Sequence, residues 1–369
     1  MSEEKKHNSW LNMIRYAGAY IALVIGAGFA SGQEVMQFFT AFGYWSIPGS
    51  AIAIVLFAFF GYIFLDMGRK LNTASHGPVL RYYCGNYIGT FIEWVTTFFL
   101  FGIFAVMVSG GGAAMTQYYG INPYVGRVLL VVISIISVLM GLKKLVNYIS
   151  VIAPFTIIIS LIVGLFTFFS NLDGFANAAT ALQIITVAKG APNWLLSPII
   201  YVSYNIMCSI PLLAAIGYSA NNIDEARKGA IIGGATLGVA ALALNLGMLS
   251  IITKVYDKDI PVLYMAQKVF PFIGVIFSIV LIAEIYSTAV PLLYGFVSNF
   301  AKEGINKFKI MTVITAIAGL VVGLFPFGKL VGILYPFFGY IGLFTMAAVF
   351  YRTFIVKKEI IPEKSKTTQ

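Results

Sequence analysis

Charged residues are scarce in this sequence of 369 residues. Only 10% of the residues are Asp, Glu, Lys or Arg, while 59% are hydrophobic. Soluble domains carry roughly 25% charged residues, so this chain has too little polar surface to coat a water-soluble globule of its length. Apolar runs longer than about 18 residues recur along the whole chain, so lipid is the expected surrounding.

Cysteine and histidine are also rare, with two of each. Cys84 falls in a short predicted loop and Cys208 inside an apolar run, so we expect two ordinary small residues rather than a disulfide. The sequence contains no cluster with metal-ligand spacing, no Walker loop and no Gly-x-Ser-x-Gly motif. We therefore expect neither an enzyme nor a bound cofactor, and no metal apart from Na⁺ if that is the coupling ion.

Backbone polar groups must be paired internally within a bilayer, so only helices and closed barrels can span it. Long apolar runs without alternation favour helices. We therefore expect an all-α integral membrane protein with about ten transmembrane helices. Their approximate ranges are 12–42, 46–70, 86–116, 124–141, 147–170, 193–219, 228–253, 272–300, 308–325 and 330–354.

The distribution of basic residues predicts how these spans are oriented. With both termini placed in the cytoplasm, 18 of the 24 Lys and Arg residues fall on the inner side. This asymmetry is the positive-inside pattern of a multi-pass protein of the cell (plasma) membrane. The net charge of +10 therefore reflects membrane topology, and we expect a lipid bilayer rather than nucleic acid as its partner. The polar start, residues 1–8, does not resemble a cleavable signal.

Two outer loops are long, at 171–192 and 254–271. Each is predicted to be either a plain connection or a set of short surface helices over an outer vestibule.

The two halves of the chain resemble each other within one transmembrane domain, 1–369. Repeat one covers about 12–170 and repeat two about 193–354. Lys-Leu-Val opens spans five and ten, at 144–146 and 329–331, and Pro-Phe follows at 154–155 and 336–337. Because five spans is an odd number, the second copy must be inverted, as in many transporters. Chance similarity between apolar segments remains the alternative.

Spans one and six carry helix-breaking residues at corresponding places. Span one reads Gly26-Ala-Gly-Phe-Ala-Ser-Gly32-Gln-Glu34, and span six contains Tyr204, Asn205 and Ser209 just before Pro211. Glycine weakens a helix and proline removes one of its hydrogen bonds. We therefore expect both spans to be broken beside a transport site. The alternative is that the glycines only allow close helix packing, which suits Ser109-Gly-Gly-Gly112 of span three.

The motif of span one resembles that of the YkvI-like amino-acid permeases, a branch of the amino acid–polyamine–organocation superfamily. The resemblance implies a LeuT-like fold, a 5+5 inverted repeat with broken helices 1 and 6, and a substrate site between them. It places a substrate carboxylate near the amides of Ala27 and Gly28. The implied substrate-binding residues are Gly26, Ala27, Gly28, Phe29, Ala30, Ser31, Gly32, Tyr204, Asn205 and Ser209.

The same resemblance implies a cation site between spans one and eight. Its predicted ligands are the carbonyls of Ala22 and Ile25 and the side chains of Glu284, Ser287 and Thr288. Glu284 departs from the pattern, which has a small residue there. An acid near the middle of a span is costly and is by default a functional hypothesis. We expect it to couple transport to Na⁺ or H⁺, the alternative being a buried structural acid.

Three other acids are candidates for gating or capping. Ser31 and Glu34 fit a capping box, and direct contact of Glu34 with ligand or proton is the alternative. Asp66 lies four residues before Lys70, which suits an ion pair at the end of span two. Glu93 either joins an inner gate with Arg15 or simply lies at the interface.

Together these features predict an ion-coupled secondary transporter of the symporter type. Its substrate is expected to be a small organic solute, an amino acid or a related zwitterion. The alternative is a non-transporting ligand sensor on the same fold, which would show saturable binding without flux. The sequence leaves the oligomeric state open.

Overall fold

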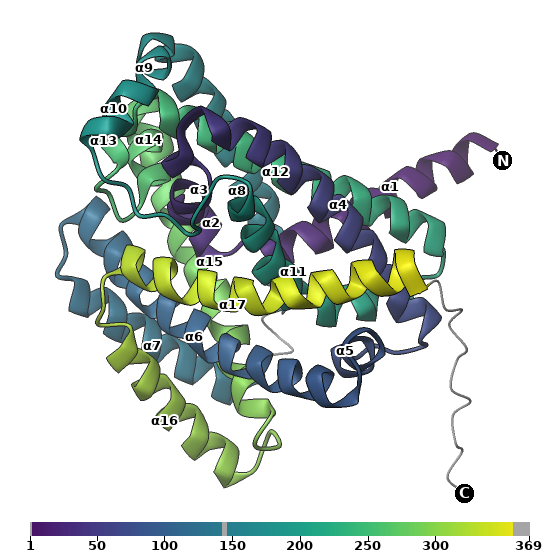
Figure 1. Ribbon diagram of the computed structural model, residues 1–369. Helices are drawn as coiled ribbons and strands as arrows, with labels where there is room; N and C mark the ends of the chain where they lie inside the picture. The colour runs from purple at the N-terminus through teal and green to yellow at the C-terminus, as the bar shows by residue number, and fades with distance from the viewer. Residues whose placement is uncertain (1, 142–145, 357–369) are drawn as a thin grey trace, which may run out of the picture.

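The computed structural model describes residues 2–141 and 146–356, and its regular secondary structure there is helical throughout (Figure 1). Side chains of residues 2–8, 23 and 146–154 are not described. The long helices beyond the first predicted span are α4 (Ser46–Lys70), α6 (Asn86–Tyr119), α7 (Pro123–Met140), α8 (Val146–Ser170), α11 (Leu196–Ser219), α12 (Ile223–Ser250), α15 (Pro271–Ser298), α16 (Asn306–Val322) and α17 (Phe327–Phe350).

The first predicted span is interrupted, as its glycines indicated. It consists of α1 (Ser2–Val24), α2 (Ala27–Ser31) and α3 (Gln33–Phe38), followed by the 3₁₀ helix η1 (Thr40–Trp45). Gly32, between α2 and α3, has φ +88°, a conformation that favours glycine. A Cβ there would also approach the Val262 side chain to 2.7 Å. This interruption therefore depends on glycine both for its backbone conformation and for space.

The predicted break in span six is wrong, because α11 is a continuous helix with Pro211 inside it. Its polar side chains donate hydrogen bonds to its own backbone. Asn205 Nδ2 donates to the Tyr201 carbonyl at 2.9 Å, and Ser209 Oγ donates to the Asn205 carbonyl at 2.7 Å. Neighbouring helices and such side-chain bonds allow proline within membrane helices. The polar cluster before Pro211 thus accompanies a continuous helix rather than an unwound one.

In the described residues, seven helical segments are long and apolar enough to cross a membrane. They contain α4, α6, α7, α11, α12, α15 and α17. Of the other predicted spans, the first is interrupted, α16 has 17 residues, and the described apolar part of α8 is Phe155–Ser170. The chain is therefore a multi-pass membrane protein. The count of ten spans and the inverted repeat stay predictions, and Leu145 and Lys144 of the repeat motif lie outside the described residues.

Glycines allow the central helices to pack closely. A Cβ at Gly234 of α12 would lie 2.5 Å from the Phe57 backbone of α4, and a Cβ at Gly217 of α11 would collide with the Leu65 carbonyl. In α6, a Cβ at Gly112 would lie 2.8 Å from the Pro123 carbonyl of α7. The glycine cluster of span three is thus a packing feature, as small residues in membrane helices often are.

Short helices are present in both long outer loops. They are α9 (Leu172–Ala176), α10 (Ala178–Ile184), α13 (Ile252–Val255) and α14 (Pro261–Val269). In Figure 1 these helices gather at one end of the molecule, whereas α5 (His76–Cys84) lies toward the other end. Gln117 of α6 exchanges hydrogen bonds of 2.8 and 2.9 Å with the Ile260 backbone at the start of α14. This exchange ties α14 to the end of α6.

Candidate functional site

A cavity of about 230 Å³ lies beside the interruption between α1 and α2. Residues from α1, the break, α3, α6, α11, α15 and α17 line it. Ligand cavities form where helices of a bundle diverge, and 230 Å³ is below the usual range of roughly 300–1,000 Å³ for drug-sized ligands. The cavity is therefore sized for a small solute.

Nine of the predicted site residues line this cavity. They are Ala22, Ile25, Gly26, Glu34, Tyr204, Asn205, Glu284, Ser287 and Thr288. The remaining predicted substrate-binding residues do not line it, namely Ala27, Gly28, Phe29, Ala30, Ser31, Gly32 and Ser209. The first-turn amides of α2 have no acceptor within the helix, but the cavity meets the break at Ile25 and Gly26 rather than at Ala27 and Gly28.

Glu34 is directed into the bundle, toward Tyr204 and Asn205 of α11. It is only 4% exposed. Gly28 makes room for it, because a Cβ there would lie 2.8 Å from Glu34 Cδ and closer still to Oε1. Glu34 Oε2 and the Tyr204 hydroxyl are both buried, and neither has a partner in hydrogen-bonding geometry within the described residues. The carboxyl and the hydroxyl therefore face each other at the cavity wall without a hydrogen bond of regular geometry.

The predicted capping box is wrong. Gly32, not Ser31, is the N-cap of α3, and no side chain caps it. Ser31 Oγ instead donates to the Gly28 carbonyl at 2.8 Å and accepts from the Gln33 amide at 3.3 Å. The left-handed conformation of Gly32 turns the chain so that Glu34 faces α11 instead of the helix end.

Glu284 has a hydrogen-bond donor that the sequence analysis missed. Thr156 Oγ1 of α8 donates to Glu284 Oε2 at 3.0 Å, and both side chains are buried. Ser287 Oγ donates to the Glu284 carbonyl at 3.0 Å. Thr288 faces the break, since a Cβ on Gly26 would lie 3.5 Å from its methyl group and 3.6 Å from its hydroxyl. The structure thus brings the predicted cation site of α15 against the end of α1.

The apolar part of the wall was also missed. Leu100, Ile103 and Met107 of α6 and Leu292 of α15 line the cavity. Tyr335 of α17 lines it too, with its ring centroid 4.9 Å from that of Tyr204. Tyr335 precedes the proline of the repeat motif, which was the available signal for it. No sequence signal marked the leucines and the isoleucine, because the pattern of an apolar helix does not distinguish its apolar residues from one another.

The cavity has no basic side chain to balance its two acids. Among the described residues that line it, none is Lys, Arg or His. The last turn of α1 ends there, and the final carbonyls of a helix have no partner within it and carry partial negative charge. The described lining therefore offers hydrogen-bond acceptors and the negative end of a helix, without a basic side chain.

Glutamines of α3 close the end of the molecule where the short loop helices gather. Gln33 Nε2 donates to the Lys258 carbonyl at 2.7 Å. Gln37 Nε2 donates to Gln33 Oε1 and to the Gly328 carbonyl, both at 2.9 Å. A separate cavity of about 390 Å³ lies on the loop side of this network. Beside it, burial raises the pKa of the Asp259 carboxyl, although a backbone hydrogen bond from Gly328 acts in the opposite direction.

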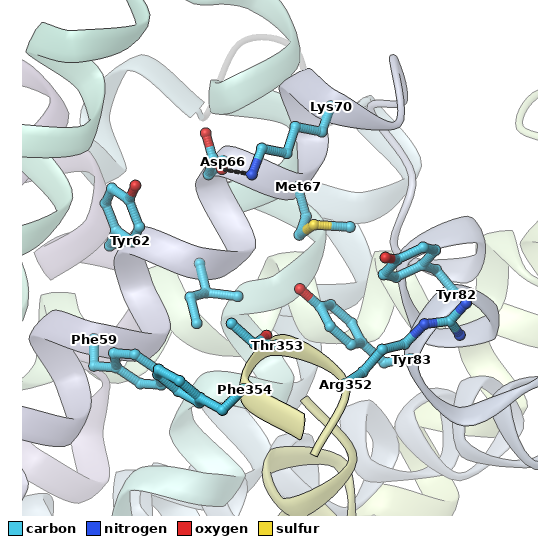
Figure 2. A pocket seen from close by; sticks show the side chains of 11 residues that line it. Phe59, Tyr62, Asp66, Met67, Lys70, Tyr82, Tyr83, Arg352, Thr353 and Phe354 are labelled. Atoms are coloured by element: carbon cyan, nitrogen blue, oxygen red, sulfur yellow. Dashed lines mark ion pairs between the residues drawn. The ribbon is translucent and has the colours of Figure 1, made fainter. Parts of the chain in front are cut away.

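Asp66 lies at the far end of α4, where a third cavity, of about 520 Å³, opens among α4, α5 and the π-helix η3 (Tyr351–Val356). Lys70 Nζ lies 2.8 Å from Asp66 Oδ2, and Figure 2 shows the Lys70 side chain directed toward Asp66. Arg227 of α12 also donates to Asp66, through Nε at 2.9 Å. Arg352 lies over the Tyr82 ring, 4.0 Å from its centroid (Figure 2). The charged groups of this cavity already have partners in the protein.

Of the two alternatives for Glu93, the gate with Arg15 is not formed. Glu93 Oε2 instead accepts from Arg81 of α5 at 2.7 Å. Arg15 lies on the exposed side of α1. The position of Glu93 near the start of α6 lets it meet the neighbouring α5, which is closer than α1.

The sequence matches no protein-family model. Two relatives from Bacillus subtilis (strain 168) are similar over almost their whole length. The uncharacterised membrane protein YkvI is 27% identical over 336 residues, covering 90% of this chain and 94% of YkvI. The uncharacterised protein YyaD is 26% identical over 345 residues, covering 92% and 96%.

Solved structures with a similar arrangement include one described as a transporter and one described as a symporter. A mutant of the Eremococcus coleocola manganese transporter matches with a TM-score of 0.59 and 13% identity, over 92% of this chain and 78% of that chain. A Na⁺-coupled sialic acid symporter matches with 0.55 and 14%, over 94% and 86%. The inward-facing conformation of Mhp1 matches with 0.51 and 14%, over 92% and 77%.

The chain has the LeuT fold. At these identities the likeness concerns the fold alone. In this fold the cavity lies against the interrupted first span. The cavity and the interruption share the residues Ile25 and Gly26.

Proposed function

We propose that this protein is an ion-coupled secondary transporter of the symporter type. Its solute is a small organic molecule, an amino acid or a related zwitterion. The observation that carries the proposal is the cavity at the interruption of the first span, whose wall holds buried acids on both sides. Interrupted helices around a central cavity are the usual place for substrate and coupling ion in secondary transporters. The assignment to the YkvI-like permeases belongs to the same proposal.

The coupling ion, Na⁺ or H⁺, binds between α1 and α15. Glu284, Ser287 and Thr288 lie about one helical turn apart or less, so they address one site. The end of α1 supplies the carbonyls of Ala22 and Ile25, which both line the cavity. An ionised acid in the bilayer is costly, so binding a cation or proton beside Glu284 stabilises the loaded state relative to the empty one.

Access to the cavity alternates between the two sides of the membrane. The Gln33–Gln37 network joins α3 to the 257–260 loop and to the start of α17 and closes the loop side. The cavity lies beyond it, along the middle of α6 and the later turns of α15. With both termini in the cytoplasm of the cell, this arrangement closes the site to the outside. Loading from outside requires the hydrogen bonds of Gln33 and Gln37 to break. Solute transport is coupled to the ion when binding of both shifts the equilibrium between the closed and open states.

Uptake into proteoliposomes tests the proposal. Purified protein is given labelled amino acids under an inward Na⁺ gradient, an inward proton gradient, or neither. A transporter of this kind concentrates at least one solute when one gradient is applied and only equilibrates it without a gradient. Saturable binding with no flux under either gradient would contradict transport and favour a ligand sensor.

A further inference from the structure

We propose that Glu34 and Tyr204 form the recognition site for a positively charged amino group of the solute. This inference rests on the proposed function and names the chemical group that the cavity selects. It is distinct from the cation site at Glu284, which belongs to the coupling ion.

The first observation is that Glu34 and Tyr204 face each other at the cavity wall, and each holds a buried polar atom without a hydrogen bond of regular geometry. Glu34 is 4% exposed and Tyr204 is 3% exposed, and both line the cavity. Glu34 Oε2 and the Tyr204 hydroxyl have no partner in hydrogen-bonding geometry within the described residues. A buried polar atom without a well-formed hydrogen bond is unfavourable. An ammonium group placed between them would donate to the carboxylate and to the hydroxyl oxygen and so satisfy both.

The second observation is that the backbone is shaped to hold Glu34 in this position. The Glu34 carboxyl passes over Gly28, where any Cβ would collide with it. The left-handed Gly32 turns α3 so that Glu34 faces α11. Two glycines of the span-one motif therefore serve the placement of one acid. A merely structural acid would be expected to have hydrogen-bond donors for both of its oxygens.

The third observation is the set of acceptor groups in the cavity. It contains two carboxyl groups and the carbonyl end of α1, a 23-residue helix, without a basic side chain among its described lining. Acceptor groups of this kind favour a cationic donor and oppose an unaccompanied carboxylate. The two acids differ in their surroundings, because Glu284 accepts from Thr156 while Glu34 faces Tyr204 and Asn205 without a hydrogen bond of regular geometry. We therefore assign the solute to Glu34 and the ion to Glu284.

The remaining wall favours an organic amine over a metal ion. Leu100, Ile103, Met107 and Leu292 present hydrocarbon and thioether surface to the cavity. No group of three or more His, Cys, Asp or Glu residues within the described chain could hold a metal. An apolar wall with a few convergent polar groups is the usual form of a small-molecule site. An aliphatic or aromatic body attached to an ammonium group matches both parts.

The test uses matched sets of small molecules on purified full-length protein in detergent. Each set contains an amino acid, its decarboxylated amine and its deaminated acid: alanine, ethylamine and propanoic acid; leucine, 3-methylbutylamine and 4-methylpentanoic acid; phenylalanine, phenethylamine and 3-phenylpropanoic acid. Binding is measured from the shift of the thermal unfolding midpoint with concentration, up to the millimolar range. Mn²⁺ and Na⁺ alone are separate probes.

We expect the amine-bearing members of at least one set to bind and the deaminated member not to bind. Glu34→Gln should weaken that binding roughly 10–100-fold, because a hydrogen bond to a charged group is lost. Tyr204→Phe should weaken it roughly 3–10-fold. Glu93→Gln, the same change outside the cavity, where the acid pairs with Arg81, should leave amine binding in detergent within about threefold of wild type.

A double-mutant cycle separates recognition from damage to the fold. Gly28→Ala keeps the charge of Glu34 but displaces its carboxyl, so it should weaken amine binding in the wild-type background. In the Glu34→Gln background it should add little, which is the non-additivity expected of one site. Equal losses of amine affinity in both backgrounds would show that Gly28 does not position the Glu34 carboxyl.

Four results would overturn the amino-group site: equal binding of the deaminated acid, unchanged affinity in Glu34→Gln, response to Mn²⁺ alone, or no binding of any amine-bearing probe. The site and the transport function fail separately. Amine binding that requires Glu34, with no flux in vesicles, would keep the site and refute transport. Undiminished concentrative uptake by Glu34→Gln would refute the site and keep transport.

Discussion

Thr156 donates a hydrogen bond to Glu284 across the contact between α8 and α15, with 3.0 Å between the two oxygens. The two residues are 128 positions apart in the sequence. Glu284 thus has a side-chain donor of regular geometry, whereas Glu34, the other acid of the cavity, faces Tyr204 and Asn205 without one. This difference underlies the proposed assignment of the ion to Glu284 and of the solute to Glu34.

Thr156→Val should change the dependence of transport on the coupling ion. A hydrogen bond to a charged group contributes about 1.5–3 kcal/mol, so the apparent ion affinity should shift roughly 10–100-fold, toward tighter binding if the ion is H⁺, because the donor favours the ionised carboxylate. The measurement is the ion concentration that gives half-maximal uptake. Ser160→Ala is the matched control, since Ser160 is also buried on α8 and its hydroxyl has no hydrogen-bond partner within the described residues. An unchanged ion dependence in Thr156→Val would contradict the role of this bond.

Gly28→Val should abolish transport without preventing membrane insertion. Its side chain would occupy the place of the Glu34 carboxyl, and overpacking of this kind costs about 1–3 kcal/mol. Uptake and the amount of folded protein are measured together. Gly18→Val on α1 is the control, because a Cβ at Gly18 has nothing within 4 Å. Normal uptake by Gly28→Val would remove the proposed site.

Gln37→Leu should open the side of the protein closed by the glutamine network. It removes two hydrogen bonds, to Gln33 and to the Gly328 carbonyl. Each contributes about 0.5–1.5 kcal/mol, so the closed state should lose roughly 5–150-fold in population relative to the open one.

The opening is measured as the distance between spin labels on Lys258→Cys and Lys329→Cys, in a background without Cys84 and Cys208. Tyr44→Phe serves as control, because the Tyr44 hydroxyl bonds only within the loop side, to the Phe175 and Ala176 carbonyls. The control should give the same distance distribution as the labelled protein that retains Gln37. A distribution that does not lengthen in Gln37→Leu would contradict the closing role of the network.

Asp66→Asn should destabilise the protein more than Glu93→Gln does. The Asp66 side chain is 6% exposed and binds both Arg227 and Lys70, whereas the Glu93–Arg81 pair is 32% and 37% exposed. Removing the buried acid should cost about 1.5–3 kcal/mol of unfolding free energy, and the exposed one about 0–1 kcal/mol. Thermal unfolding of both variants at low and high salt compares them. Equal losses of unfolding free energy would show that burial does not determine how much these ion pairs stabilise the protein.

The helical membrane fold and the interruption of the first span were predictable from local composition. Long apolar runs select helices, and three glycines within residues 26–32 mark a weak helix. The continuity of α11 was not predictable in this way. Its Ser209 and Asn205 side chains bond backward along the helix, and a polar cluster before a proline looks the same in a broken helix.

The residue types of the site were more predictable than the contacts between those residues. Glu34, Tyr204 and Glu284 were chosen because polar residues at mid-span are costly, and the structure brings them to one cavity. Their partners come from contacts between distant segments, which local patterns do not encode. Thr156 meets Glu284 and Gly28 makes room for Glu34 only after the helices have packed.

The most direct test of ion-coupled transport is uptake by Glu284→Gln in proteoliposomes, compared with wild type under the gradient that drives wild-type uptake. The variant keeps the size of the side chain and loses its charge. We predict that it still binds the solute and exchanges labelled for unlabelled solute, but no longer concentrates it against a gradient. Concentrative uptake equal to that of wild type would refute the coupling role and leave Glu284 as a buried structural acid.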